Sequence, residues 1–295
     1  MLSTTYFLGC PMWANRAWQG SLLEPGRRTA DFLSDYARVL NTVEGNTTFY
    51  AVPNAEKVRH WRDQTPPSFR FCFKFPKVIS HELALLNCER EVASFFEAMA
   101  PLGRRLGPFF LQLPPSFCDL DRLSRFLTVL PKSFRFAVEV RHPAFFAGDA
   151  IERDFEAMLT GLEMDRVLFD TERLMTFQSS DDGVKAAQRK KPSVPRRTNA
   201  TGRHPFLRYA GLPSVERDEE GVRFWADQTA AWLAEGKQPF VFMHQVPEDD
   251  EAPELCRMFH HQLQTRIADL GPMPEWPGER AAGEDEGASR QMPLF

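Results

Sequence analysis

The chain has 295 residues, of which 43% are hydrophobic and 26% charged, and its formal net charge is −4. This length is normal for one α/β barrel, and the composition is that of a globular protein with a sizeable core. The negative balance excludes a protein that binds duplex DNA through an overall basic surface. The five cysteines are widely spaced and form no C-x-x-C pair, which excludes a zinc ribbon and a thioredoxin motif and favours reduced thiols.

The N-terminal segment and the apolar runs bear on where the protein resides. Residues 1–10 lack both the basic region and the apolar region of a signal peptide. No apolar run approaches the roughly 20 residues that are needed to cross a bilayer. We therefore expect a cytoplasmic protein with no membrane partner.

Short β-rich runs alternate with amphipathic helical patterns along the chain. The run 69–75 is the clearest, because phenylalanine recurs at every second position while Cys72 and Lys74 share the opposite face. A helical stripe is equally clear in the leucines at 120, 123, 127 and 130. Asn54 and Pro253 suit helix starts. We predict eight strands, at 5–9, 42–46, 69–75, 109–113, 135–141, 167–170, 206–209 and 240–244.

Eight parallel strands with helical crossovers predict a single-domain (β/α)₈ barrel of the TIM type over residues 1–268. An open doubly wound sheet is the alternative. That fold usually begins with a Gly-rich turn, whereas this chain has Gly9-Cys10-Pro11 there and contains no P-loop.

Two segments fall outside the alternation. Residues 177–203 hold seven Lys/Arg against two Asp, without an apolar period, which predicts a mobile basic loop between the sixth and seventh strands. Residues 269–295 are rich in proline, glycine and acidic residues, which predicts a flexible tail.

Polar and ionisable residues stand near the carboxyl end of almost every predicted strand, where barrel enzymes hold their active sites. Buried charges are costly unless they are paired, so a shared solvated cleft is the favoured interpretation. A salt-bridge lattice without a functional role is the alternative. The residues are Glu44, Asn46, Lys74, Gln112, Glu139, Arg141, His142, Asp170, Arg208 and His244.

The residue types suggest an enzyme for an anionic substrate. Lys74, Arg141 and Arg208 are suited to bind a phosphate or a carboxylate. We expect general acid and base roles among Glu44, Glu139, Asp170 and His142, and the reaction classes that fit are hydrolysis and elimination of a phosphate-containing substrate. That substrate is expected to be a phosphorylated small molecule or a nucleic-acid end. The lack of a nucleophile elbow disfavours covalent acyl chemistry.

A metal ion is not indicated by the spacing of its candidate ligands. His81, His142 and His244 are able to ligate a divalent ion together with the carboxylates. No H-E-x-x-H or comparable spacing supports such a site, so the cofactor is left open and no metal ligand is assigned.

Several motifs resemble the YecE-like family, which is domain of unknown function 72. They are G-C-P-M-W at 9–13, V-E-G-N-T-T-F-Y at 43–50, W-R-D-Q-T-P at 61–66, F-K-F-P-K-V-I-S-H at 73–81, L-G-P-F-F-L-Q-L-P-P-S-F at 106–117 and A-V-E-V-R-H at 137–142. The resemblance covers residues 5–265 and implies a TIM-type barrel, but no agreed reaction. It marks as site residues Glu44, Asn46, Thr48, Tyr50, Lys74, His81, Gln112, Glu139, Arg141 and His142.

The chain departs from the family pattern in two places. The basic segment 177–203 is longer than in plain members, and His244-Gln245-Val246 replaces the Asn-Asn-Asp type that often follows the last strand. Because of the second departure, the family pattern does not define the role of the eighth strand in this chain.

The last five residues resemble the pentapeptide that binds the bacterial DNA sliding clamp. Gln291 suits a polar pocket rim, and Leu294 and Phe295 suit an apolar groove, where their burial contributes roughly 3–5 kcal/mol before ordering costs. The alternatives are a chance match and a catalytically inert barrel that serves as an interaction platform. If the clamp interpretation holds, the basic segment is expected to contact the DNA backbone.

Overall fold

The structure, a computed structural model, describes residues 6–281. Every predicted strand is present within a few residues of its expected bounds. The strands are β1 (Phe7–Gly9), β2 (Thr42–Gly45), β3 (Arg70–Phe73), β4 (Phe109–Gln112), β5 (Phe136–Glu139), β6 (Asp165–Asp170), β7 (Phe206–Gly211) and β8 (Phe240–Gln245).

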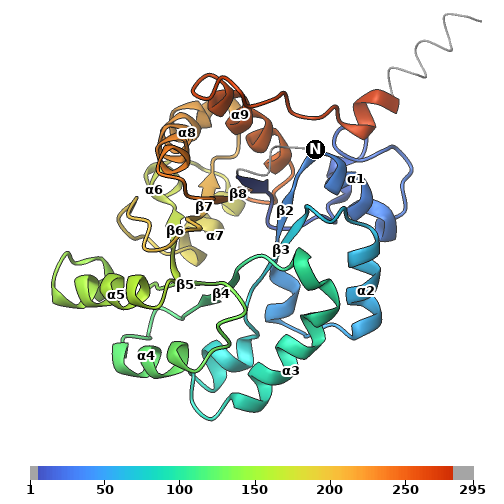
Figure 1. Cartoon of the computed structure of the whole chain (residues 1–295). Coiled ribbons are helices and arrows are strands. Elements are labelled where there is room, and N and C mark those ends of the chain that lie inside the picture. Colours follow the sequence, from blue (N-terminus) through green and yellow to red (C-terminus); the bar gives the residue numbers. More distant parts are fainter. Residues whose placement is uncertain (1–5, 282–295) are drawn as a thin grey trace, which may run out of the picture.

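The helices lie around the strands, as Figure 1 shows. They are α1 (Phe32–Val39), α2 (Ala55–Asp63), α3 (Glu89–Met99), α4 (Leu120–Thr128), α5 (Ala150–Gly161), α6 (Glu172–Thr176), α7 (Asp182–Lys190), α8 (Glu219–Ala234) and α9 (Ala252–Gln264). Asn54 caps α2 as predicted, because its side chain accepts a hydrogen bond from Lys57 N–H at 2.9 Å. Pro253 stands in the first turn of α9, as predicted.

The strands form a curled parallel sheet of six, in the order β1-β8-β7-β6-β5-β4, and a parallel pair, β2-β3. Pairing of the first strand with the last is foreign to the doubly wound order 3-2-1-4-5-6, so that alternative is wrong. The predicted barrel is confirmed in part: all eight strands are present and parallel to their neighbours, but they form two sheets and not one closed sheet. Figure 1 shows the strands at the centre of the molecule.

The two faces of the strands carry different apolar cores. In β3, Phe71 and Phe73 belong to the large core between strands and helices, whereas Cys72 belongs to a separate cluster on the other face, as the alternation predicted. That second cluster, the inner cluster, consists of Phe7, Cys72, Phe110, Ala137, Val167, Phe206, Phe240 and Phe242. Because its members come from seven strands, it lies on the concave side of the curled sheet.

The basic segment 177–203 is not the loop that was predicted. Residues 182–190 form α7, which Asp181 caps by accepting from Val184 N–H at 2.9 Å. Val184 is buried in an apolar cluster with Phe169 at the end of β6. Beyond α7, Arg196 and Arg197 form ion pairs with Asp170 and Glu152. Local capping and these pairs hold the segment against the domain, which a count of charges does not reveal.

The segment 269–281 also differs from the expected flexible tail. Leu270 and Trp276 are buried, and the Arg257 guanidinium stacks 3.5 Å from the centre of the Trp276 ring. Burial of these two apolar side chains stabilises the packing of the segment against the rest of the domain. Residues 291–295, with the clamp-like pentapeptide, lie outside the described residues. None of the helices in the range 6–281 is long and apolar enough to pass through a membrane.

Candidate active site

A polar layer follows directly on the inner cluster, toward the carboxyl ends of the strands. Side chains two residues apart on a strand share a face, so each residue two positions after a member of the inner cluster also points inward. This rule places five charged or polar residues side by side from five strands or strand ends: Lys74, Gln112, Glu139, Arg208 and His244. Glu44 of β2 joins them through its contact with Arg208.

Arg208 is the centre of this polar layer. Its guanidinium makes two hydrogen bonds to Glu44, with Nε 2.8 Å from Oε2 and Nη2 2.6 Å from Oε1. Its Nη1 donates to Glu139 Oε2 at 2.5 Å. All three side chains are buried, so each charge depends on the others.

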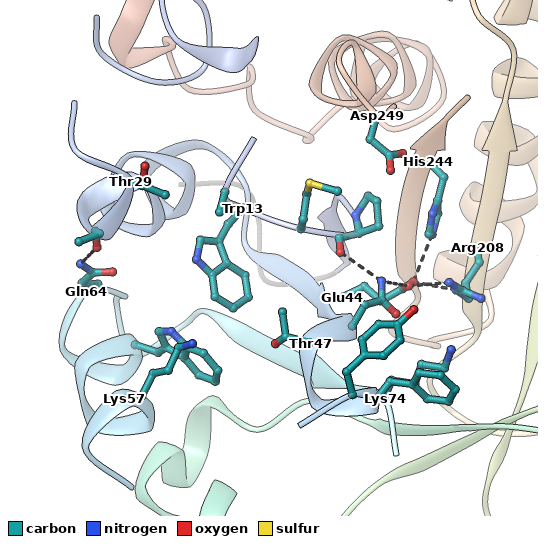
Figure 2. Close-up of a pocket in the computed structure, with 18 of the residues that line it drawn as sticks. Trp13, Thr29, Glu44, Thr47, Lys57, Gln64, Lys74, Arg208, His244 and Asp249 are labelled. Atoms are coloured by element: carbon teal, nitrogen blue, oxygen red, sulfur yellow. Dashed lines mark hydrogen bonds and ion pairs between the residues drawn. The ribbon is translucent and has the colours of Figure 1, made fainter. Parts of the chain in front are cut away.

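The network continues on both sides of this triad. Glu139 Oε1 accepts from Arg141 Nε at 2.6 Å, and Arg141 Nη2 donates to Gln112 Oε1 at 2.8 Å. Glu44 also accepts from Asn46 Nδ2 at 2.7 Å, and His244 Nε2 lies 3.2 Å from its Oε2 (Figure 2). The structure thus brings together seven of the residues predicted from the sequence, which come from five strands and the residues just after them.

The two carboxylates of the network are held in the charged form. Burial raises the pKa of Glu44, but Arg208 and His244, through their charges and hydrogen bonds, together outweigh it and hold that pKa well below its ordinary value. Burial acts on Glu139 in the same direction, while Arg141, Arg208 and Lys74 bring its pKa to about 2. Both groups are therefore charged at neutral pH, which suits them to position Arg208 better than to donate a proton.

Lys74 differs from the arginines beside it, because its ammonium group bonds no carboxylate in the described part of the chain. Nζ lies 3.7 Å from the centre of the Phe49 ring, and no hydrogen bond or ion pair of this atom is present within residues 6–281. The side chain is 9% exposed. Burial, together with the nearby charges of Arg208 and Arg141, lowers the pKa of Lys74 to about 8.

A cavity of about 810 Å³ opens onto this polar layer, within the size range of small-molecule sites. Figure 2 shows Glu44, Lys74, Arg208, His244 and Asp249 at one end of it. Trp13, Thr29, Lys57 and Gln64 lie toward the other end (Figure 2). Aromatic side chains contribute much of the wall, namely Trp13, Phe49, Tyr50 and Trp61.

Three residues beside the polar layer and the cavity were not predicted from the sequence. Phe169 follows Val167 by two positions, and its ring lies 4.7 Å from the Arg208 guanidinium carbon and 5.6 Å from Lys191 Nζ. Lys191, just after α7, and Asp249, after β8, both line the cavity. The rule of two along β6 could have found Phe169. Nothing local distinguishes Lys191 from its basic neighbours, or Asp249 from the acidic run around it.

Asp170, for which a catalytic role is predicted, does not lie in this polar layer. It is one position out of phase with Val167 and Phe169 and therefore points to the opposite face of β6. There its Oδ2 accepts from Trp225 Nε1 at 2.6 Å and pairs with Arg196 at 2.9 Å. Asp170 thus ties β6 to α8 and to the basic segment.

The remaining predicted residues lie at the edge of the site or outside it. His142 caps the turn 143–146 by accepting from Ala144 N–H and does not line the cavity. His81 contacts the Phe49 ring at 5.1 Å and shares a hydrogen bond with Ser80. Tyr50 lines the cavity at its rim and is 82% exposed. Within residues 6–281 no three His, Cys, Asp or Glu side chains come close enough to hold a metal ion.

Comparisons with known proteins agree on the family. The UPF0759 protein YecE of Escherichia coli (strain K12) is 37% identical over 273 residues, which cover 92% of this chain and 97% of that protein. Solved structures of DUF72 family proteins from Enterococcus faecalis V583 and Thermotoga maritima MSB8 superpose with a TM-score of 0.66 each, at 19% and 20% identity. They cover 91% and 88% of this chain and 99% of their own chains. The family described as "Protein of unknown function DUF72" matches residues 7–280, and the chain therefore belongs to it.

Proposed function

We propose that the protein is an enzyme whose cavity binds an anionic, phosphate-bearing small molecule. The observation that carries this proposal is a pair of ammonium groups, those of Lys74 and Lys191, that face the cavity without a carboxylate bonded to either in the described part of the chain. Cations in such a position gain a partner when an anion binds.

The charge balance of the site supports an anion. Arg208 and Arg141 are already bonded to Glu44 and Glu139, so the two carboxylates are satisfied from within the protein. Lys74 and Lys191 add positive charge that these carboxylates do not neutralise. Burial and the charge of Arg208 also lower the pKa of Lys191, which is a sign of an ammonium short of counter-charge.

Proton transfer is assigned to two residues whose pKa values move toward neutrality. Burial raises the pKa of Asp249, which makes its carboxyl group a better proton donor than an ordinary aspartate. Lys74, with a pKa of about 8, is the corresponding acceptor. In this proposal Glu44 and Glu139 hold Arg208 in place, and the reaction is a hydrolysis or an elimination.

Calorimetric titration tests the proposal. We expect the wild-type protein to bind glycerol 3-phosphate or pyrophosphate, and Lys74→Met and Lys191→Met each to weaken binding by at least about tenfold, the worth of one charge-assisted hydrogen bond. Lys185→Met is the matched control, because Lys185 lies on α7 but donates to Ser180 O at 3.0 Å and does not line the cavity.

Two results would count against the anion site. One is the absence of binding to any phosphorylated compound, which would favour an inert interaction platform. The other is equal binding by the wild type and both cavity variants. Tight binding of a 5′-phosphorylated oligonucleotide, but of no small phosphate, would replace the small molecule by a nucleic-acid end.

We also infer that the two parallel sheets are arcs of one eight-stranded barrel. Single hydrogen bonds support this, since Phe75 N–H donates to Phe110 O at 3.0 Å and Glu44 N–H donates to Cys10 O at 3.1 Å. A Cβ atom on Gly9 would lie 2.1 Å from the Thr42 carbonyl oxygen, so glycine permits the close approach of β1 and β2. Slow hydrogen exchange of these amides would support closure, and rapid exchange would oppose it.

A second proposed function is tethering to the DNA sliding clamp through Gln291, Leu294 and Phe295. The observation in its favour is the pentapeptide Q-M-P-L-F at the end of the sequence. We expect removal of residues 291–295 to abolish co-elution with a purified bacterial clamp without changing thermal stability. Failure of the intact chain to bind the clamp would dismiss this proposal.

A further inference from the structure

Lys74 has surroundings that an anion-binding lysine does not require. Its side chain is nine-tenths buried, and Nζ is in contact with the face of Phe49 at 3.7 Å. The carboxylates nearest to it are engaged elsewhere, Glu44 by Arg208 and Glu139 by both arginines. An ammonium that only held an anion would gain from staying charged, yet the two neighbouring guanidiniums repel it.

We propose that Lys74 is a nucleophilic amine that condenses with the carbonyl group of an anionic aldehyde or ketone bound in the cavity. The proposal rests on the proposed anion site and names its substrate class. Lys191 lines the same cavity, with its Nζ 5.6 Å from the centre of the Phe169 ring, and is suited to hold the carboxylate or phosphate of such a molecule.

The chemistry balances with groups of the cavity. The lone pair of neutral Nζ forms a bond to the carbonyl carbon, and the carbonyl oxygen takes up a proton while Nζ loses one. The resulting hydroxyl group then leaves as water with a second proton, and a C=N bond remains. Asp249 lines the cavity and is suited to supply the proton, since burial raises the pKa of its carboxyl group. The net change is the release of one water molecule, with the proton from Asp249 leaving in that water, the C=N group protonated and the Asp249 carboxylate charged.

The state of the amine makes the reaction feasible near pH 8. With a pKa of about 8, roughly half of the Lys74 side chains are neutral at that pH. A lysine with an ordinary pKa is almost wholly charged there, so the fraction of reactive amine differs on the order of a hundredfold. Arg141 and Arg208, by repelling the ammonium, contribute to this state.

Borohydride trapping with peptide mass mapping tests the inference on the full chain. The protein is incubated at pH 8 with pyruvate or with glyceraldehyde 3-phosphate and reduced with sodium borohydride, which converts the C=N bond into a stable secondary amine. We expect the adduct on Lys74 to form far faster than on any other lysine, by up to the hundredfold difference in neutral amine. The two probes show whether a carboxylate or a phosphate is the preferred anion.

Two variants sharpen the readout. Lys74→Arg keeps the positive charge but removes the amine, so we expect the adduct to disappear while anion binding remains. Lys185→Arg is the control, because Lys185 lies on α7, donates to Ser180 O at 3.0 Å and does not line the cavity, and we expect unchanged trapping. Since mass mapping locates the adduct in the wild-type protein, the test stands even if a variant fails to fold.

The outcomes separate this inference from the proposed function. Anion binding without any adduct on Lys74, or with adducts spread evenly over the surface lysines, would overturn the inference alone. Equal trapping of neutral acetone, with no binding of anions, would overturn the anionic substrate class together with the proposed function.

Discussion

Two arginine–glutamate networks in this molecule use the same residue types, but they differ in whether unpaired charges lie beside them. One is the polar layer around Arg208. The other, the α5 network, joins Arg166 and Arg197 to Glu152, which bonds Arg166 Nη1 at 2.9 Å and Arg197 Nε at 2.6 Å. In the α5 network the guanidiniums also donate to backbone carbonyls, Arg166 to Phe145 O and Arg197 to Phe146 O. That network is closed and leaves no side chain short of a partner.

In the network around Arg208, the groups that have partners are the carboxylates and the guanidiniums. Its carboxylates are satisfied, but the ammonium groups of Lys74 and Lys191 stand beside it and face a cavity. The comparison teaches that buried ion pairs by themselves do not identify a site. What distinguishes the functional candidate is unmatched charge next to space for a ligand.

The largest effect is expected from breaking the network at its centre. Arg208→Met leaves Glu44 and Glu139 buried without their main partner, which should lower the free energy of unfolding by about 3–5 kcal/mol. Urea denaturation measures this loss. A loss below about 1 kcal/mol would mean that water reaches the two carboxylates and that the layer is open.

A smaller loss in the free energy of unfolding is expected when the α5 network is broken at Arg166. In Arg166→Met, Glu152 keeps its bonds to Arg197, and the Glu156 side chain is 23% exposed, so we expect a loss of about 2–3 kcal/mol. Because this network lies away from the cavity, calorimetry should show unchanged anion affinity. A weakened affinity would break the division into a functional and a structural network.

The smallest expected effect concerns the pH dependence of stability. The pKa of Lys74 is about 8 in the folded protein and about 10.4 in an unfolded chain. Between these values the unfolded state binds more protons, so the free energy of unfolding should rise with pH as the buried ammonium loses its charge. We expect the wild type to gain on the order of 2 kcal/mol relative to Lys74→Met across this window. Urea denaturation at several pH values checks it, and a constant difference would contradict the lowered pKa.

Much of the site could be predicted because β geometry is regular. Along β3, β4, β5, β7 and β8 the alternation places Lys74, Gln112, Glu139, Arg208 and His244 on the inner face, and the structure confirms this placement. On β6 the predicted residue is the strand end, Asp170, whereas the alternation from Val167 leads to Phe169. On this strand the carboxyl-terminal residue and the inward-facing residue are different positions.

Other parts of the site depend on loops, and these could not be predicted. Lys191 lines the cavity just after α7, and α7 is held by the burial of Val184 in one apolar cluster with Phe169, Ala210 and Val246, which come from three different strands or strand ends. Asp249 reaches the cavity from the loop after β8, where its side chain also accepts from Gln245 N–H at 2.7 Å. Loop conformations of this kind follow from such contacts and not from local propensity.

The sequence by itself determined the strands, the alternation of their faces and the family, because side-chain period and motif order are local properties of the chain. Only the tertiary structure decided which charges find partners. Glu44 and Arg208 are 164 residues apart and bind each other because their strands point the same way around one concave face. Among residues 6–281, Lys74 bonds no carboxylate for the same reason, since Glu44 and Glu139 are already bound to arginines from other strands.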